Sequence, residues 1–118
     1  MGCLLHTLAS TLTPAQVEQY IRSLPRIKKQ LPAGTFEVNE GIRDLIYQYR
    51  YFVLQQVDID KCNTLAPENL EKSYKHVVME NYTPVVVTAE FASIDGFHRL
   101  CILKAHQQDN VWAYVGQR

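Results

Sequence analysis

The sequence predicts a small mixed α/β (α+β) domain that follows an N-terminal helical segment. The chain has 118 residues, which is enough for one hydrophobic core and too few for two. Apolar residues recur at helical spacing in the first half, and β-branched or alternating runs follow in the second half. With 47% hydrophobic and 20% charged residues, the composition is that of an ordinary folded protein. We therefore expect a helical segment over 1–50, packed on the core, and an α/β domain over 51–118.

Two amphipathic helices are predicted in the N-terminal segment. Thr13 is a typical N-cap residue, with Pro14 at the first helical position and Gln16 at the third. The apolar stripe of this helix is Val17, Tyr20, Ile21 and Leu24. Asn39 can cap the second helix, whose stripe is Ile42, Leu45, Ile46 and Tyr49. Because Tyr47, Tyr49 and Tyr51 also alternate at period two, this helix gives way to a strand somewhere over 48–52.

The second half alternates strands with helices. A β-branched run at 84–89 predicts a buried strand, and the alternating residues 91–94 predict its hairpin partner. A helix is expected directly after Asp95 and Gly96. The other predicted elements are a strand that ends at 57–59, a helix that begins at Pro67 and runs to about Val78, and a last strand over 111–115.

Charge and cysteine content exclude several classes of protein. Twelve basic and twelve acidic side chains give no net charge, which removes the positive field that drives non-specific binding to nucleic acid. Cys3, Cys62 and Cys101 form no CxxC pair, so we expect neither a disulfide scaffold nor a zinc site, and the cytoplasm is the expected location. The apolar runs are shorter than the roughly 18 residues that span a bilayer, so no membrane partner is expected.

The most informative stretch joins a predicted strand to a predicted helix. It contains Asp95, Gly96, Phe97, His98 and Arg99. Such a junction favours anions, because the backbone N–H groups and the partial positive charge of a helix N-terminus attract phosphate. Glycine allows close approach of the backbone, and arginine adds a planar fork of donors. We therefore interpret these five residues as a candidate phosphate site.

This stretch and two others also resemble a known fold family. Residues 57–61 resemble the opening strand of the ParB/sulfiredoxin fold, residues 84–87 its central strand, and residues 94–100 its DG-x-HR phosphate loop. The resemblance implies a site for ATP or CTP with Mg²⁺, and it places the phosphates at Gly96, His98 and Arg99. The identity of any metal ligand stays unknown.

Departures from the family pattern narrow the expected function. Sulfiredoxin has its reactive cysteine directly before the histidine, and Phe97 stands there, so repair of sulfinic acids is not expected. The chain has one arginine where the ParB clamp has an arginine-rich box, so chromosome partitioning is not expected either. Free serine kinases of this fold use an acidic residue just after the opening strand, and Glu68 stands near that place. The resemblance thus implies a phosphotransferase or nucleoside triphosphate hydrolase, with Glu68, Asp95 and His98 as candidate catalytic residues.

Two alternative functions remain open. One is a non-catalytic interaction or regulatory module on the same fold, in which the N-terminal helices bind a protein partner or a second copy of the chain. The other is a ParB-like nuclease or DNA-binding protein, which the neutral charge does not favour.

Several single residues also allow two interpretations. Asp58 and Asp60 are either solvated or metal-binding. The tyrosines at 47, 49 and 51 are either packing residues or a surface for stacking on bases. Cys101 is expected to be an inert core thiol.

Overall fold

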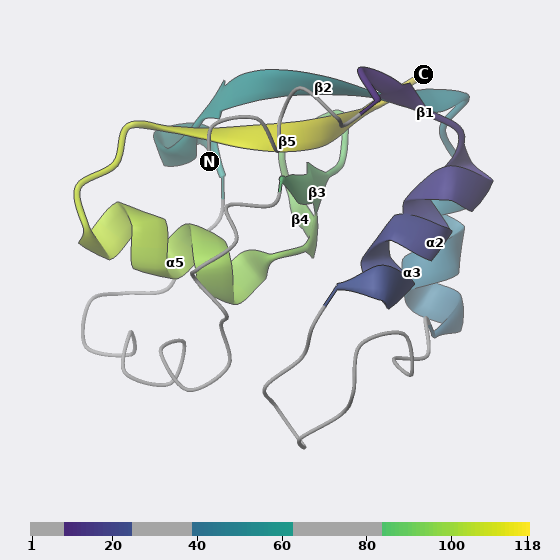
Figure 1. The fold of residues 1–118 in the computed structure, drawn as a ribbon, viewed down its shortest axis with the longest axis horizontal. Coiled ribbons are helices and arrows are strands. Elements are labelled where there is room, and N and C mark those ends of the chain that lie inside the picture. The colour runs from purple at the N-terminus through teal and green to yellow at the C-terminus, as the bar shows by residue number, and fades with distance from the viewer. Residues whose placement is uncertain (1–8, 25–38, 63–83) are drawn as a thin grey trace.

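The computed structural model describes residues 9–24, 39–62 and 84–118 (Figure 1). This part of the chain is a mixed α/β globule, which confirms the predicted fold class. Its helices are α2 (Pro14–Ser23), α3 (Glu40–Tyr47) and α5 (Phe97–Ala105), with a short 3-10 turn η2 (Ile59–Lys61). Its strands are β1 (Thr11–Leu12), β2 (Tyr51–Asp58), β3 (Val85–Val87), β4 (Ser93–Asp95) and β5 (Asn110–Gln117).

The five strands form one mixed sheet in the order β1-β2-β5-β3-β4. The long strands β2 and β5 are antiparallel, from Tyr51 opposite Gln117 to Asp58 opposite Asn110. Strand β3 runs parallel to β5 and antiparallel to β4, so the hairpin predicted for 84–94 is confirmed. Strand β1 was not predicted, because two residues are too few to show alternation.

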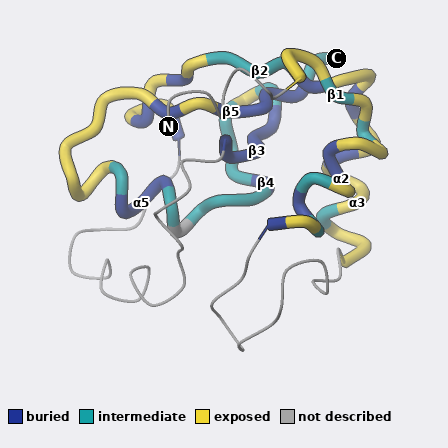
Figure 2. Tube along the Cα trace, viewed as in Figure 1, coloured by how far each residue is buried: buried dark blue, intermediate teal, exposed yellow. Residues whose placement is uncertain are grey.

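The helices cover both faces of this sheet. On one face, side chains of α2 and α3 join Phe52, Val86 and Tyr114 in one buried cluster. On the other face, Leu100 of α5 packs with Val85 and Val87 in a second cluster. Because side chains alternate along a strand, the three valines of β3 serve both cores in turn. Figure 2 shows the resulting dark blue buried positions along the middle of the molecule.

Local signals in the sequence account for the starts of α2 and α3. The Thr13 hydroxyl accepts a hydrogen bond from the Gln16 N–H at 3.2 Å, and the Gln16 side chain accepts one from the Thr13 N–H at 2.8 Å. This reciprocal pair is the predicted capping box. The Asn39 side chain accepts a hydrogen bond from the Ile42 N–H at 2.9 Å, as predicted for the cap of α3.

The three alternating tyrosines at 47, 49 and 51 have different surroundings. Helix α3 ends at Tyr47, so Tyr49 lies beyond it, and its ring packs edge-on against Phe52 with 5.4 Å between centroids. Tyr49 is buried, whereas Tyr47 is 48% exposed and Tyr51 41% exposed. The prediction of core packing is therefore confirmed for Tyr49. Tyr47 lies at the surface and packs against α2 through its hydrogen bond with Glu18, and base stacking by Tyr47 or Tyr51 stays a prediction.

Some predicted features lie outside the described residues. The helix expected from Pro67 and its candidate catalytic residue Glu68 are among them. Within the described ranges, no helix is long and apolar enough to cross a membrane.

Candidate functional site

The candidate site is built around Gly96, between β4 and α5. Gly96 has φ +97° and occupies the N-cap position of α5. A Cβ added to it would lie 2.5 Å from Cγ1 and 2.9 Å from Cβ of Val85. Side chains at φ near +97° are disfavoured for L-residues, so both the backbone and the packing require glycine here. Glycine was expected at this position because it lets a phosphate come close to the backbone. The close contact with β3 is a second reason why no larger residue fits.

A bulge in β4 comes directly before Gly96. Asp95 lies opposite Val86 and Ser93 lies opposite Val87, so Ile94 is an extra residue in the ladder. Bulges bend a strand and are common beside active sites, where they redirect the chain. Here the bulge precedes the sharp change of direction at Gly96, from which α5 runs back across the sheet.

Burial of α5 holds the first turn of this helix in place. Leu100, Cys101 and Ile102 are at most 1% exposed, and the Leu100 N–H donates to the Gly96 carbonyl at 2.9 Å. The prediction of Cys101 as a core thiol is confirmed by this burial. Because the middle of α5 is fixed against the sheet, its first turn has a defined position and direction.

The five candidate phosphate residues therefore form the end of β4 and the beginning of α5. Asp95 ends β4, and Phe97, His98 and Arg99 are the first three residues of α5. Asp95, Phe97 and Arg99 are half-buried, and Nε of Arg99 lies inside the fold. His98 is described by its backbone only.

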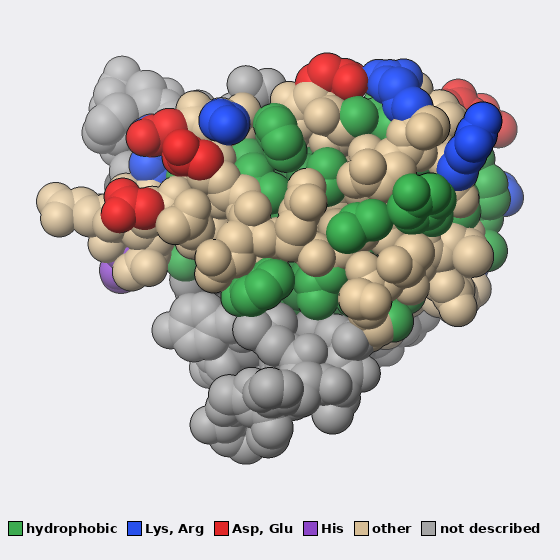
Figure 3. All heavy atoms as spheres, turned by 90° about the horizontal axis from the view of Figure 1, so that it is seen from above, with side chains coloured by type: hydrophobic (Ala, Val, Ile, Leu, Met, Phe, Trp, Pro, Cys, Tyr) green, Lys and Arg blue, Asp and Glu red, His purple; other side chains and the backbone are tan. Residues whose placement is uncertain are grey.

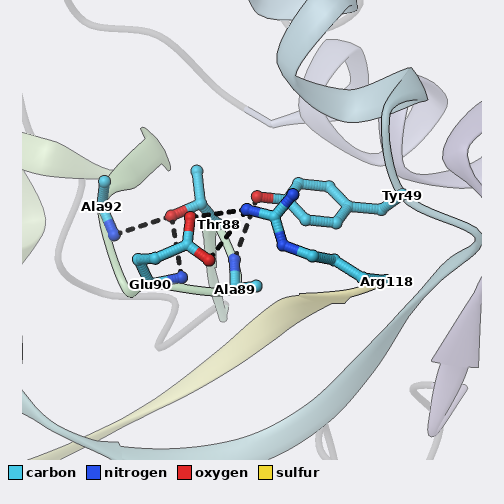
Figure 4. Close-up of polar contacts among 6 residues, drawn as sticks. All are labelled: Tyr49, Thr88, Ala89, Glu90, Ala92 and Arg118. Carbon is cyan, nitrogen blue, oxygen red and sulfur yellow. Dashed lines mark hydrogen bonds and ion pairs between the residues drawn. The ribbon is translucent and has the colours of Figure 1, made fainter.

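The turn between β3 and β4 contains hydrogen bonds that the predicted hairpin did not include. The buried Thr88 hydroxyl accepts hydrogen bonds from the N–H groups of Glu90 at 3.2 Å and Ala92 at 3.0 Å (Figure 4). The Thr88 N–H also donates to the Ala92 carbonyl at 2.8 Å. The sequence signal for such a turn is Thr88 itself, because a threonine hydroxyl can accept hydrogen bonds from backbone N–H groups a few residues further on. The turn sets where β4 begins, and therefore where Gly96 lies.

Two distant residues reach the same turn. The Tyr49 hydroxyl accepts a hydrogen bond from the Ala89 N–H at 3.1 Å. Arg118 contacts both carboxylate oxygens of Glu90 at 2.8 Å, and its guanidinium lies 5.4 Å from the centroid of the Tyr49 ring (Figure 4). This carboxylate raises the pKa of Arg118. No local pattern connects residues 28 or 40 positions apart, so the sequence alone carried no signal for these hydrogen bonds.

The acidic pair at the end of β2 has a structural role. The Asp58 side chain accepts a hydrogen bond from the Asp60 N–H at 2.9 Å, and thereby caps η2. Lys104 donates to Asp60 at 2.6 Å, which raises the pKa of Lys104. Among the described residues, no group of three or more His, Cys, Asp or Glu side chains is arranged to hold a metal ion.

A second polar cluster joins α2 to α3. The buried carboxylate of Glu18 accepts hydrogen bonds from Arg22 at 2.6 Å and from the Tyr47 hydroxyl at 2.9 Å. Arg43 approaches the same carboxylate at 3.5 Å. The hydrogen bond with Glu18 raises the pKa of Tyr47. An open hollow of about 460 Å³ beside this cluster is lined by Glu40, Arg43, Asp44 and Tyr47.

The surface seen from the β1–β2 side bears on the DNA-binding alternative. Figure 3 shows hydrophobic side chains among polar ones on this face, with basic and acidic side chains close together near its margin. The basic groups form no continuous stripe across the part of this face that is described. The arrangement agrees with the balanced charge of the sequence.

Comparisons with known proteins gave one structural likeness. No family model matches the chain, and no curated protein matches it. A solved structure described as a Pnob8-like ParB-N domain is similar over 56% of this chain, with 22% sequence identity and a TM-score of 0.36. The chain spans 30% of the length of that structure.

Proposed function

We propose that the protein binds the phosphates of a nucleoside triphosphate, ATP or CTP with Mg²⁺, at the junction of β4 and α5. The observation that carries the proposal is Gly96, which at φ +97° turns the chain from β4 into the N-terminus of α5. In an α-helix the first N–H groups have no partner within the helix, and the helix dipole favours anions at this end. Gly96 places no capping side chain over them.

The residues around this helix start supply suitable chemistry. Arg99, in the first turn, offers a fork of donors for phosphate oxygens, and His98 adds a further donor. Asp95 ends β4 and directly precedes Gly96, so it is our candidate residue to contact Mg²⁺ or an attacking group. The metal would neutralise charge on the phosphates during transfer. Glu68 is our candidate for a second catalytic acid, which makes a phosphotransferase or nucleoside triphosphate hydrolase of the ParB/sulfiredoxin type the proposed enzyme class. The odd number of cysteines and the lack of a CxxC pair are compatible with a cytoplasmic location.

A titration with ATP, CTP, GTP and ADP, each with and without Mg²⁺, tests this proposal. Ligand that binds the native state raises the melting temperature, so even weak binding is visible at high ligand concentration. Calorimetry then measures affinity for the wild type and for Arg99→Ala, which should bind about 10- to 150-fold more weakly because a charge-assisted contact of about 1.5–3 kcal/mol is lost. The same samples are assayed for release of phosphate or nucleoside diphosphate.

Lys104→Ala is the matched control, because it removes a positive charge from the opposite end of the same helix. This variant should keep the affinity of the wild type. If both variants lost the same affinity, the loss would reflect the net charge of the protein and not a contact of Arg99 with phosphate. If no nucleotide raised the melting temperature, the proposal would be contradicted. Binding without turnover would remove the enzymatic part of it.

A second candidate function is a protein-interaction module, and the surface of α3 favours it. Leu45 and Tyr47 are 38% and 48% exposed on this helix, and Tyr47 lines the hollow next to Arg43. Exposed aromatic side chains are enriched at protein interfaces. Light scattering on the wild type and on Leu45→Asp tests self-association through this surface. A wild-type oligomer that the substitution dissociates would support the candidate, and a monomer at all concentrations would exclude a second copy as the partner.

A further inference from the structure

The position of Gly96 depends on β3. The closest neighbour of Gly96 is Val85, the first residue of that strand, and the contact leaves no room for a Cβ. Asp95 is also held by β3, through its ladder position opposite Val86. Strand β3 is only three residues long, so groups that hold its two ends determine where the candidate phosphate loop lies.

The first end of β3 is held from α2. The Tyr20 hydroxyl donates a hydrogen bond to the carbonyl of Pro84, the buried residue directly before β3. The Tyr20 ring packs edge-on against Tyr114, with 5.4 Å between the ring centroids. Tyr20 belongs to the apolar stripe of α2, whose neighbours Val17 and Ile21 are fully buried. The hydroxyl is therefore carried by a helix that is itself fixed on the sheet.

The second end of β3 is held from the segment after α3. The Tyr49 hydroxyl accepts a hydrogen bond from the N–H of Ala89, in the turn directly after the strand. The Tyr49 ring is 3% exposed and lies against Gly116, where an added Cβ would come within 2.7 Å of it. Figure 4 shows the hydroxyl reaching the Thr88–Ala92 turn, with Arg118 beside the ring. Because the ring is confined in this way, its hydroxyl can occupy only a narrow range of positions.

We propose that Tyr20 and Tyr49 are positioning residues that set the geometry of the phosphate loop by holding β3 at both ends. The proposal rests on the function proposed above and extends it to the N-terminal segment, which lies outside the region that resembles the ParB/sulfiredoxin fold. Binding sites need their ligating groups held within a fraction of an ångström, and supporting hydrogen bonds provide this precision. The N-terminal helices thereby contribute to the ligand site without touching the ligand.

The test compares Tyr20→Phe and Tyr49→Phe with Tyr114→Phe. All three substitutions remove one hydroxyl and keep the ring. The Tyr114 hydroxyl donates to the carbonyl of Ala9 at 2.8 Å, so its contact is of the same kind but joins neither Pro84 nor Ala89 at the ends of β3. Urea denaturation of each variant shows that it is folded and measures the stability that the hydroxyl contributes.

Two readouts separate positioning from general stability. Calorimetry should show nucleotide affinity weakened about three- to tenfold in the Tyr20 and Tyr49 variants, as expected for one hydrogen bond, and unchanged in the Tyr114 variant. Hydrogen exchange without nucleotide should be faster at the amides of residues 96–99 in the first two variants only, because a less constrained β3 lets the loop open more often.

The outcomes distinguish this inference from the proposed function. If the wild type binds no nucleotide, the proposed function fails, and the exchange rates at residues 96–99 still decide whether the tyrosines position the loop. If exchange and affinity change equally in all three variants, or in none, the positioning role is refuted. Loss of affinity confined to the Tyr20 and Tyr49 variants, together with faster exchange at the loop, supports it.

Discussion

Replacement of Gly96 by alanine is the sharpest test of the site geometry. At φ +97° an L-residue costs about 1–2 kcal/mol more than glycine. The new Cβ would also meet Val85 at 2.5 Å from Cγ1 and 2.9 Å from Cβ, and both atoms belong to a residue that is fully buried. Overpacking of this kind typically costs about 1–3 kcal/mol, because neither the strand nor the loop can move without losing contacts. We therefore expect Gly96→Ala to lower the free energy of unfolding by about 2–5 kcal/mol.

Gly41→Ala is the matched control for this prediction. Gly41 lies in the first turn of α3, where, among the described residues, an added Cβ meets only the Asn39 side chain at 3.4 Å. Alanine restricts the unfolded chain and favours helix, so this variant should gain up to about 1 kcal/mol of stability. Urea denaturation of both variants measures the difference. If Gly96→Ala were as stable as the wild type to within about 0.5 kcal/mol, the close contact with β3 and the reasoning built on it would be refuted.

Three further predictions concern polar groups elsewhere in the fold. Glu18→Gln should lower the free energy of unfolding, measured by urea denaturation, by about 1–2 kcal/mol, because the buried carboxylate that pairs with Arg22 loses its charge. A smaller loss would mean that the cost of burying the charge offsets the gain from the ion pair. Asp60→Asn should change stability by less than about 1 kcal/mol, since its ion pair with Lys104 is exposed, and a larger loss would contradict this. Burial, and secondly a nearby carboxylate, raise the pKa of the Cys62 thiol, so the native protein should alkylate there more slowly than the unfolded chain at pH 8, as peptide mass spectrometry can show. The sign of this pKa shift also means that the stability contributed by Cys62 is complete below the ordinary thiol pKa and declines as pH rises through the native value, and a stability that rises over this range would contradict the assignment.

Features that depend on neighbours along the chain could be predicted from the amino-acid sequence. The capping box of Thr13 and Gln16 and the cap at Asn39 were predictable because each bond joins residues three positions apart. The hairpin of β3 and β4 was predictable from a β-branched run and an alternating run close together. The candidate phosphate residues were predictable as one continuous motif that turns a strand into a helix.

The contacts between distant segments, by contrast, follow from the packing of the whole fold. The parallel pairing of β3 with β5 and the division of the valines of β3 between two cores depend on contacts that no local pattern encodes. The same holds for Tyr49, which the helical stripe placed on α3 and the fold places beyond it, with its hydroxyl on Ala89. Glycine at 96 was expected to admit a phosphate, but its tightest constraint is the side chain of Val85, eleven residues earlier. Periodicity reports which face of an element is apolar, whereas the partner that covers this face is chosen by the packing of the whole chain.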